Sequence, residues 1–279
     1  MSLITVLGAS GFIGSHLVAE LASRGTDHLA IQRDDELTGC NLGDVIYCLG
    51  LTADFRTKPL ETVEAHVCKL RDLIVSCEFD SITYLSSTRI YGSDSQTASE
   101  TDSLKVDPSQ PEDLYNISKL MGESLTLNCR RKARVVRLSN VYGDDFDSMN
   151  FLPTIIFEAL RNAKITLHSS PESAKDYVNI NDVVRHLPKI ATGGTAQIYN
   201  VASGRNVTNA ELAAAIRETT GCQVTFDNKA PRISFPEINI DRVRSEFGFE
   251  PRSLLEDLDD LVATYRSAID GSRMRAGEK

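Results

Sequence analysis

A tyrosine and a lysine four residues apart could carry acid–base chemistry in this chain. Tyr115 and Lys119 lie on one face of the helix that the pattern of residues 114–128 predicts. A phenol titrates near pKa 10, and a neighbouring lysine cation would favour its phenolate form. Ser87 follows an apolar run, at the end of an expected strand, and offers a hydroxyl donor to the same substrate oxygen. On its own this tyrosine–lysine spacing also fits a pair on a helix surface.

A glycine-rich turn near the start of the chain indicates what the tyrosine would work with. Gly8, Gly11 and Gly14 stand in a GxxGxxG spacing between an expected strand and an expected helix. Such glycines permit a tight turn, let backbone N–H groups approach a pyrophosphate and let the helix pack closely on the strand. An ordinary tight turn would also use glycine, but this context predicts a nicotinamide dinucleotide, whose positive oxidised ring would further favour the phenolate. We expect cofactor contacts from Gly8, Ser10, Gly11, Phe12, Ile13 and Gly14.

The end of the second expected strand bears on which dinucleotide binds. Gln32 falls where an acid would contact a ribose 2′-hydroxyl, and Arg33 follows it. A guanidinium can hold a 2′-phosphate that a carboxylate would repel, so these two residues favour NADP(H). Asp34 and Asp35 follow closely, so NAD(H) stays open.

Composition and charge set the class of molecule. The chain has 279 residues, 41% hydrophobic and 25% charged, as in ordinary globular proteins. A net charge of −9 argues against a nucleic-acid partner, which would need a basic stripe. The six cysteines form no CxxC pair, and no apolar run approaches the roughly 18 residues of a membrane span. With no signal pattern before the first strand, we expect a cytoplasmic protein without a membrane partner.

Apolar segments and helical patterns alternate along the first half of the chain. Short runs rich in branched residues predict buried strands over 3–7, 28–32, 45–49, 82–85 and 134–137. Helical patterns lie between most of them, over 12–24, 59–77 and 114–128. The alternation predicts an α/β fold: a Rossmann-like doubly wound parallel sheet over residues 1–146 and a smaller C-terminal α/β substrate-binding lobe over 147–279. Elements from about 176–201 are expected to return to the first domain.

Six motifs, in order along the chain, resemble the extended short-chain dehydrogenase/reductase family in its nucleotide-sugar epimerase/dehydratase/reductase branch. They are GASGFIG at 8–14, LSSTRIYG at 85–92, YNISK at 115–119, RLSNVYG at 137–143, KDYVNINDV at 175–183 and YNVASG at 199–204. The resemblance implies a nucleotide-sugar substrate, Tyr115 as acid/base, Lys119 as its partner and ribose ligand, and Ser87 as substrate hydrogen-bond donor. It further implies cofactor contacts from Leu49 and Gly50, and substrate contacts from Ser86, Thr88, Arg89, Asn140 and Lys175.

Departures from the family pattern narrow the expected reaction. Its dehydratases carry an Asp-Glu pair directly after the catalytic serine or threonine, where this chain has Thr88 and Arg89. Its members that resemble GDP-fucose synthase use a cysteine and a histidine, where this chain has Arg89 and Asn150. We therefore expect hydride and proton transfer at one carbon, as in the reduction of a 4-keto sugar by NADPH. An NAD-dependent 4-epimerase and a catalytically silent dinucleotide sensor stay open as alternatives.

A short connection marks another departure. Residues 34–44 leave little room for the helix and strand that the family fits there, which predicts a narrower sheet and leaves the adenine contacts open. Farther along, Asp54 and Arg56 are candidates to touch the substrate, although both also fit an ordinary loop. The helices expected over 59–77 and 114–128 could pair two copies into a homodimer through a four-helix bundle.

Cationic side chains are needed if the substrate carries a diphosphate. Lys175, Arg205 and Arg242 are candidates, although each also fits a solvated surface charge. His66 and His168 have no metal-like spacing with other ligands, so we expect no metal site.

Overall fold

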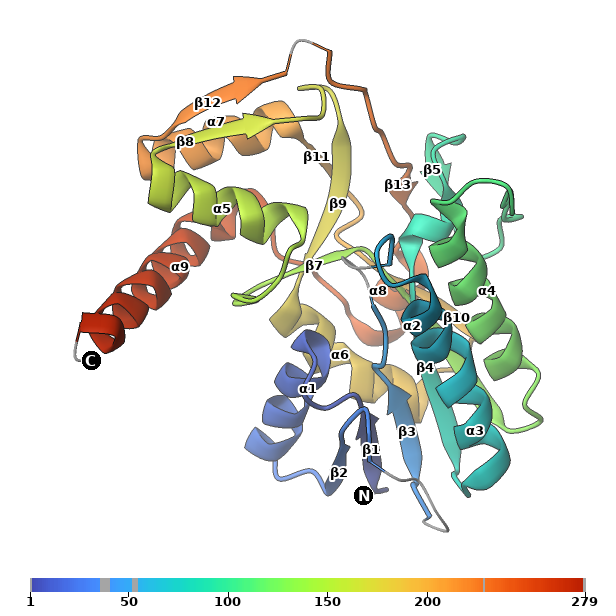
Figure 1. The fold of residues 1–279 in the computed structure, drawn as a ribbon. Coiled ribbons are helices and arrows are strands. Elements are labelled where there is room, and N and C mark those ends of the chain that lie inside the picture. The colour runs from blue at the N-terminus through green and yellow to red at the C-terminus, as the bar shows by residue number, and fades with distance from the viewer. Residues whose placement is uncertain (1, 36–40, 52–54, 228, 278–279) are drawn as a thin grey trace.

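A six-stranded parallel sheet forms the centre of the fold, in the order β10-β6-β4-β3-β1-β2 (Figure 1). The computed structural model describes residues 2–35, 41–51, 55–227 and 229–277. The strands of the sheet are β1 (Ile4–Leu7), β2 (His28–Ile31), β3 (Asp44–Tyr47), β4 (Ser81–Ser87), β6 (Lys132–Leu138) and β10 (Ile198–Val201). All neighbouring pairs run parallel, which confirms the predicted Rossmann-like architecture.

Helices cover both faces of this sheet, so β1 and β3 are buried along their whole length. α1 (Phe12–Ser23) and α6 (Ile180–Gly193) pack on one face. The other face is covered by α4 (Asp113–Leu127) and by a helical run made of α2 (Pro59–Val63), η1 (Glu64–Cys68) and α3 (Lys69–Ser76). Each face therefore has its own apolar core.

The helical run over 59–77 differs from the single regular helix that its pattern predicts, because η1 is a π-helical turn. Two tyrosine hydroxyls of the sheet donate hydrogen bonds to carbonyls of this turn: Tyr47 to Ala65 O at 2.6 Å and Tyr84 to His66 O at 3.3 Å. These donors satisfy carbonyl groups in a turn where the regular i→i−4 pattern is interrupted. The wider turn brings His66 into the interior, where its side chain is fully buried.

The narrower sheet expected from the short connection is present. β2 is the edge strand, its residues are half-buried or exposed, and Leu29 is 40% exposed. Residues 32–43, of which 36–40 lie outside the described residues, carry the chain past β1 to β3. The strand order therefore reverses between β1 and β3, and in open α/β sheets ligands bind outside the carboxyl ends of strands at such a point.

The second half of the chain builds a smaller set of elements beside the carboxyl edge of the sheet (Figure 1). A three-stranded sheet has the order β11-β9-β7, and β12 pairs with β8. α5, α7 and α9 pack together around a separate apolar core, while β5 pairs with β13 and α8 contacts β10. The bounds are β5 (Thr97–Ala98), β7 (Asn140–Tyr142), α5 (Phe151–Asn162), β8 (Lys164–Leu167), β9 (Ala174–Asn179), β11 (Asn206–Thr208), α7 (Asn209–Thr220), β12 (Gln223–Phe226), β13 (Glu237–Ile238), α8 (Asp241–Phe247) and α9 (Leu254–Gly277). The domain boundary at residue 146 stays a prediction.

Candidate active site

The glycine turn lies at the point where the strand order reverses. Gly8 has a φ of +84°, a conformation that side chains disfavour, and the amide of Gly11 donates to its carbonyl at 3.0 Å. A Cβ on Gly14 would lie 2.1 Å from Gly8 O, so only glycine lets α1 start this close to the turn. A Cβ on Gly8 would lie 3.1 Å from the amide nitrogen of Leu49, two residues after the end of β3. The geometry therefore brings together the two segments predicted to bind the cofactor.

The structure also brings the predicted catalytic side chains together. Ser87 is the last residue of β4, and its side chain lies close enough to that of Tyr115 on α4 to affect the pKa of the phenol. Tyr115 is only 3% exposed. Burial raises the pKa of its phenol, and the side chain of Ser87 and the charge of Arg89 oppose that rise. The phenol is therefore a protonated hydrogen-bond partner at neutral pH.

Lys119 lies beside this pair, and its side chain is hydrogen-bonded to the backbone of β4. Its Nζ donates to Leu85 O at 2.9 Å and lies 6.0 Å from the centroid of the Tyr115 ring. Burial lowers the pKa of Lys119 to about 7, and the charge of Glu123 only partly opposes this. Burial therefore has the largest effect on the pKa of both groups.

A bridge of opposite charges stands next to Tyr115. Glu112 accepts hydrogen bonds from Arg56, at 2.6 and 2.5 Å, and from Arg89, at 2.8 Å. Both guanidinium groups also contact the Phe55 ring, at 4.5 and 5.0 Å from its centroid. The Phe55 ring in turn lies 5.3 Å from that of Tyr115. This Arg56–Glu112–Arg89 bridge and Phe55 form one wall beside the phenol.

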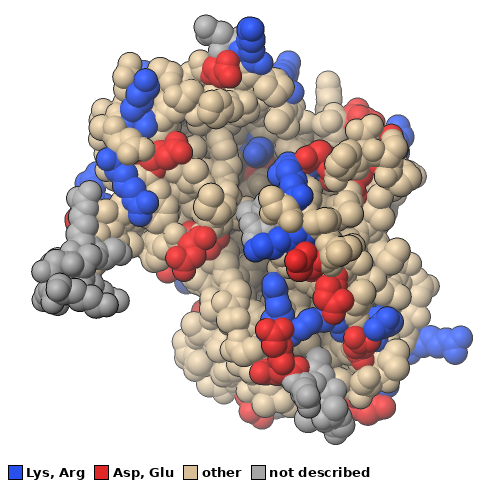
Figure 2. Space-filling view, viewed as in Figure 1, with Lys and Arg blue, Asp and Glu red and all other residues tan. Residues whose placement is uncertain are grey.

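Lys175 adds another cation to this region, on β9. Its Nζ lies 4.8 Å from the centroid of the Phe151 ring. Burial lowers the pKa of Lys175, and the positive charges of Arg89 and Arg56 lower it further. In the space-filling view a cleft runs between the two halves of the molecule, with basic side chains along it (Figure 2). The neighbouring Asn140 is exposed and donates to Asp176 O at 2.8 Å.

Two other predicted substrate residues are placed differently. Ser86 is 4% exposed, because neighbouring residues of β4 point to opposite faces of the sheet and Ser87 takes the face toward Tyr115. Thr88 is half-buried in the 3-10 turn η2 (Thr88–Tyr91). Arg89, in the same turn, donates its amide to Ser87 Oγ at 3.2 Å.

The predicted residues for the adenosine end lie at the open edge of the sheet. Gln32 and Arg33 are exposed directly after β2. The Gln32 amide donates to Asp35 Oδ2 at 2.7 Å, so this acid is held near the strand end. Lys69 Nζ donates to Arg33 O and to Asp34 Oδ1, the latter at 3.2 Å. The edge therefore presents Arg33 and Lys69 as cations together with two carboxylates.

Some candidates lie outside this arrangement. Arg205 is 72% exposed at its side chain and pairs with Glu211 at 3.6 Å. Arg242 donates to Ile198 O at 2.6 Å, so it ties α8 to β10. Asp54 lies outside the described residues. Within the described part of the chain, no group of three His, Cys, Asp or Glu side chains could hold a metal ion. No helix among those residues is long and apolar enough to cross a membrane.

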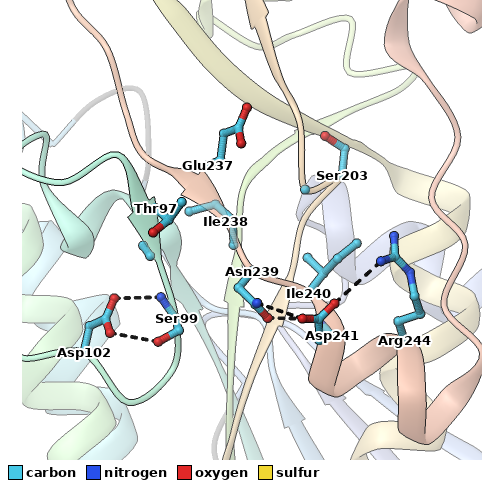
Figure 3. Close-up of a pocket in the computed structure, with 12 residues that line it drawn as sticks. Thr97, Ser99, Asp102, Ser203, Glu237, Ile238, Asn239, Ile240, Asp241 and Arg244 are labelled. Carbon is cyan, nitrogen blue, oxygen red and sulfur yellow. Dashed lines mark hydrogen bonds and ion pairs between the residues drawn. The ribbon is translucent and has the colours of Figure 1, made fainter.

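A cavity of about 390 Å³ shares no lining residue with the groups around Tyr115 (Figure 3). It lies between the β5–β13 pair, the loop at Ser203 and the start of α8. Asp102 accepts hydrogen bonds from the amide and hydroxyl of Ser99, both at 2.8 Å, and Asp241 pairs with Arg244 at 3.7 Å. Both contacts are local, one in the turn after β5 and one in the first turn of α8, and the lining includes none of the predicted catalytic residues. The candidate active site is therefore the region of Tyr115.

Several residues of the site carry no sequence signal. Phe55, Lys69 and Glu112 occupy unremarkable positions in loops or helices, and His66 has no partner at a regular spacing. Each reaches the site only through contacts between distant segments, such as the 56 positions that separate Arg56 from Glu112. Spacing along one helix or one strand could not have revealed them.

Comparisons with known proteins settle the family. A sequence model of the NAD dependent epimerase/dehydratase family matches residues 4–202, so the chain belongs to that family. It is 23% identical to UDP-glucuronic acid decarboxylase 2 of Arabidopsis thaliana, over 97% of this chain and 69% of that protein. It is 24% identical to dTDP-4-dehydro-6-deoxy-D-allose reductase of a Streptomyces species, over 94% of this chain and 96% of that protein. Its fold matches that of MoeE5 in complex with UDP-glucose and NAD, with a TM-score of 0.79, 23% identity, and 95% and 99% of the two chains covered. The predicted family is confirmed.

Proposed function

We propose that this protein reduces the 4-keto group of a nucleotide-activated sugar with NADPH, and that Tyr115 is the proton donor. The observation that carries the proposal is that Ser87 lies beside Tyr115, with Lys119 one helical turn away. A protonated phenol of raised pKa suits the reductive direction, since it must give a proton to the carbonyl oxygen. The similarity to a dTDP-sugar 4-ketoreductase supports the same reaction.

The residues present fit a nicotinamide dinucleotide. The glycines at positions 8, 11 and 14 add no side chain at the N-terminus of α1, where a pyrophosphate binds favourably. A Cβ on Gly50 would lie 3.4 Å from Lys119 Nζ, so this glycine keeps open the space beside the lysine. Lys119 would hold the nicotinamide ribose there, and Arg33 the adenosine ribose phosphate. When bound, the reduced nicotinamide supplies the hydride.

The protein's own groups account for the remaining steps. Ser87 and Tyr115 would hydrogen-bond to the substrate carbonyl oxygen and so fix the carbon that is reduced. Tyr115 donates its proton to that oxygen as it becomes an alkoxide, and the phenolate that results is stabilised by the Lys119 cation. The cations Arg56, Arg89 and Lys175 would bind the anionic diphosphate of the substrate.

Elimination and carbon epimerisation find less support at this site. Both need a group that can remove or return a proton at a carbon next to the ketone. Glu112 is the carboxylate that the bridge brings near Tyr115, but its hydrogen bonds to Arg56 lower its pKa, with a further contribution from Arg89. A carboxylate whose pKa is lowered by two guanidinium groups is both a poor proton donor at neutral pH and a weak base.

An NAD-dependent 4-epimerase is the second candidate. Asp34 and Asp35 lie beside Arg33 at the open edge of the sheet, and an acid there would suit a ribose 2′-hydroxyl. The complex of MoeE5 contains NAD. The pairing of Lys69 with Asp34 favours NADPH instead, because it reduces the negative charge that a 2′-phosphate would meet.

We also propose a homodimer formed through α2, α3 and α4. Leu60 on α2 is 80% exposed, Val75 on α3 is 78% exposed and Met121 on α4 is 50% exposed. Pairing these helices with those of a second copy would bury the apolar side chains.

The function is tested with the purified protein and dTDP- and UDP-4-keto-6-deoxyglucose, prepared enzymatically. Loss of NADPH absorbance that depends on the sugar is the expected result, with NADH used less well. The cofactor that copurifies is measured in parallel. Tightly bound NAD, together with interconversion of UDP-glucose and UDP-galactose without added cofactor, would establish the epimerase and overturn the reductase.

A further inference from the structure

His66 occupies a buried position between the two halves of the candidate site, and no step of the proposed reaction uses it. Its side chain is fully buried in η1, which packs against α4. The approach is close because residue 122 is glycine: a Cβ there would lie 2.9 Å from His66 O. π-helical turns inside helices occur frequently at functional sites, which suggests that the contacts of this histidine have a function.

One ring nitrogen of His66 holds the cofactor side of the site. The amide of Leu51 donates to His66 Nε2 at 3.3 Å. The carbonyl of the same peptide group, Gly50 O, accepts a hydrogen bond of 3.3 Å from Arg33. A single peptide group after β3 is therefore held between Arg33 and His66. A Cβ on Gly50 would meet His66 Nε2 at 3.2 Å and Lys119 Nζ at 3.4 Å, so this peptide also borders the catalytic lysine.

The other ring nitrogen holds the catalytic helix. His66 Nδ1 lies 2.8 Å from Ser118 Oγ, and that hydroxyl donates to Tyr115 O at 2.8 Å. The His66 ring also meets the Tyr115 ring edge to face, with 5.4 Å between centroids and 82° between planes. Because an amide can only donate, Nε2 must accept from Leu51, and the proton of a neutral imidazole lies on Nδ1. Each bond in the chain from Leu51 to Tyr115 then has one donor and one acceptor.

The imidazole is neutral in this environment. Burial lowers the pKa of His66 to about 2, and the positive charge of Lys119 contributes to the shift. Charged His66 would have no proton acceptor for the Leu51 amide and would repel Lys119. Lys119 is therefore the group of this pair that can carry a positive charge near neutral pH, and His66 contributes geometry rather than charge.

We propose that His66 is a positioning residue, which holds the Gly50–Leu51 peptide for the cofactor through Nε2 and holds Tyr115 for the substrate through Nδ1 and Ser118. The inference rests on the proposed roles of Gly50 and Tyr115. It predicts that the two contacts can be separated, since each ring nitrogen serves one of them. The amide side chains of Asn and Gln can replace one nitrogen each, Asn near Nδ1 and Gln near Nε2.

Two variants test this separation. His66→Asn keeps a donor for Ser118 and loses the acceptor for Leu51, so the Kd of NADPH should rise about 3- to 10-fold, as expected for one hydrogen bond. His66→Gln keeps the acceptor, so that Kd should stay within about twofold of the wild-type value while kcat falls. Ser118→Ala removes the second contact without altering His66 and should also lower kcat but not the affinity for NADPH. The Ser118→Ala variant tests the contact with Tyr115 even if a His66 variant does not fold. Thermal unfolding of each variant measures the purely structural effect.

A spectroscopic readout does not depend on turnover. In ¹⁵N-histidine-labelled wild-type protein, the ring signals of His66 are identified as those that a His66 variant lacks. Between pH 8 and pH 5 their chemical shifts should be those of a neutral ring with the proton on Nδ1. An imidazolium or an Nε2-protonated ring at pH 7 would overturn the proposal, and so would equal NADPH affinity and equal kcat in all three variants and the wild type. If the wild-type protein reduces no 4-keto sugar, the proposed function fails, whereas the NADPH affinities and the ring state still decide the position of His66.

Discussion

Arg89 donates a hydrogen bond of 2.8 Å to Glu112, while its guanidinium carbon lies 5.8 Å from the centroid of the Tyr115 ring. One side chain thus connects the charged wall of the site to the proposed proton donor. The carboxylate of Glu112 is half exposed, and ion pairs of this kind contribute about 0–1 kcal/mol to stability. The bridge can therefore exchange partners with an anionic substrate at little energetic cost.

The first prediction concerns this bridge. Arg89→Ala should raise the KM of the nucleotide sugar about tenfold, because a charged hydrogen bond to the diphosphate is lost, and should leave the Kd of NADPH unchanged. Arg71→Ala is the control, since Arg71 pairs with Asp72 on the surface of α3. Steady-state kinetics and fluorescence titration measure the two constants. An unchanged KM in Arg89→Ala would remove this arginine from the substrate site.

The phenol of Tyr115 provides the second prediction. Tyr115→Phe should lower kcat about 10²- to 10⁴-fold, which is the usual contribution of a general acid, because no other proton donor replaces the hydroxyl. Cofactor affinity and the unfolding temperature should change little, since the ring contacts with Phe55 and His66 remain. A catalytically silent sensor would show no turnover in the wild-type protein and hence no loss.

Lys119 provides a prediction about pH. With its pKa lowered to about 7, the lysine loses its positive charge as pH rises through 7, so kcat/KM of the reduction should fall above that pH. Lys119→Arg should move this decline to higher pH even if its maximum rate is lower, because a guanidinium stays charged. A flat profile from pH 6 to pH 9 in the wild-type enzyme would contradict the role of the lysine cation.

The same shift has a consequence for stability. Since the pKa of Lys119 is lower folded than the ordinary 10.5, unfolding takes up a proton between about pH 7 and pH 10.5, and stability contributed by this group rises with pH there. Lys119→Met should therefore raise the free energy of unfolding at pH 7 by about 1–3 kcal/mol while abolishing turnover. Urea unfolding at pH 7 and pH 9 measures the effect, which should be smaller at the higher pH.

Cofactor preference provides the next prediction. Arg33→Ala should weaken NADPH about tenfold or more and change the Kd of NADH much less, because only NADPH carries the 2′-phosphate. Arg24→Ala is the control, since Arg24 lies at the C-terminal end of α1 and pairs with Glu20 of that helix. Titration with both cofactors tests the assignment, and equal weakening of the two would indicate that Arg33 acts only through its bond to Gly50 O.

The anchoring of α4 provides a prediction about folding. Arg137 on β6 and Glu123 on α4 form a buried pair with hydrogen bonds of 3.0 and 2.8 Å. Arg137→Met should lower the free energy of unfolding by about 3–5 kcal/mol, because it leaves a buried carboxylate without its partner. Arg137→Met/Glu123→Leu should recover much of that loss. A double variant as unstable as the single one would assign the loss to packing instead.

The sequence by itself determined the fold class and predicted the residues of the candidate site. Glycines at 8, 11 and 14 between a strand and a helix, and Tyr115 and Lys119 at helical spacing, are local patterns, and local geometry follows from them through known periodicities. The narrower sheet also followed from a local property, the length of the connection before β3.

Only the tertiary structure decided how these groups behave. It showed that burial outweighs nearby charge at Tyr115 and Lys119, because desolvation depends on every segment packed around a group. It also brought Glu112 between two arginines and His66 between a cofactor loop and the catalytic helix. Such contacts join residues more than 14 positions apart, and no periodicity of a helix or strand encodes them.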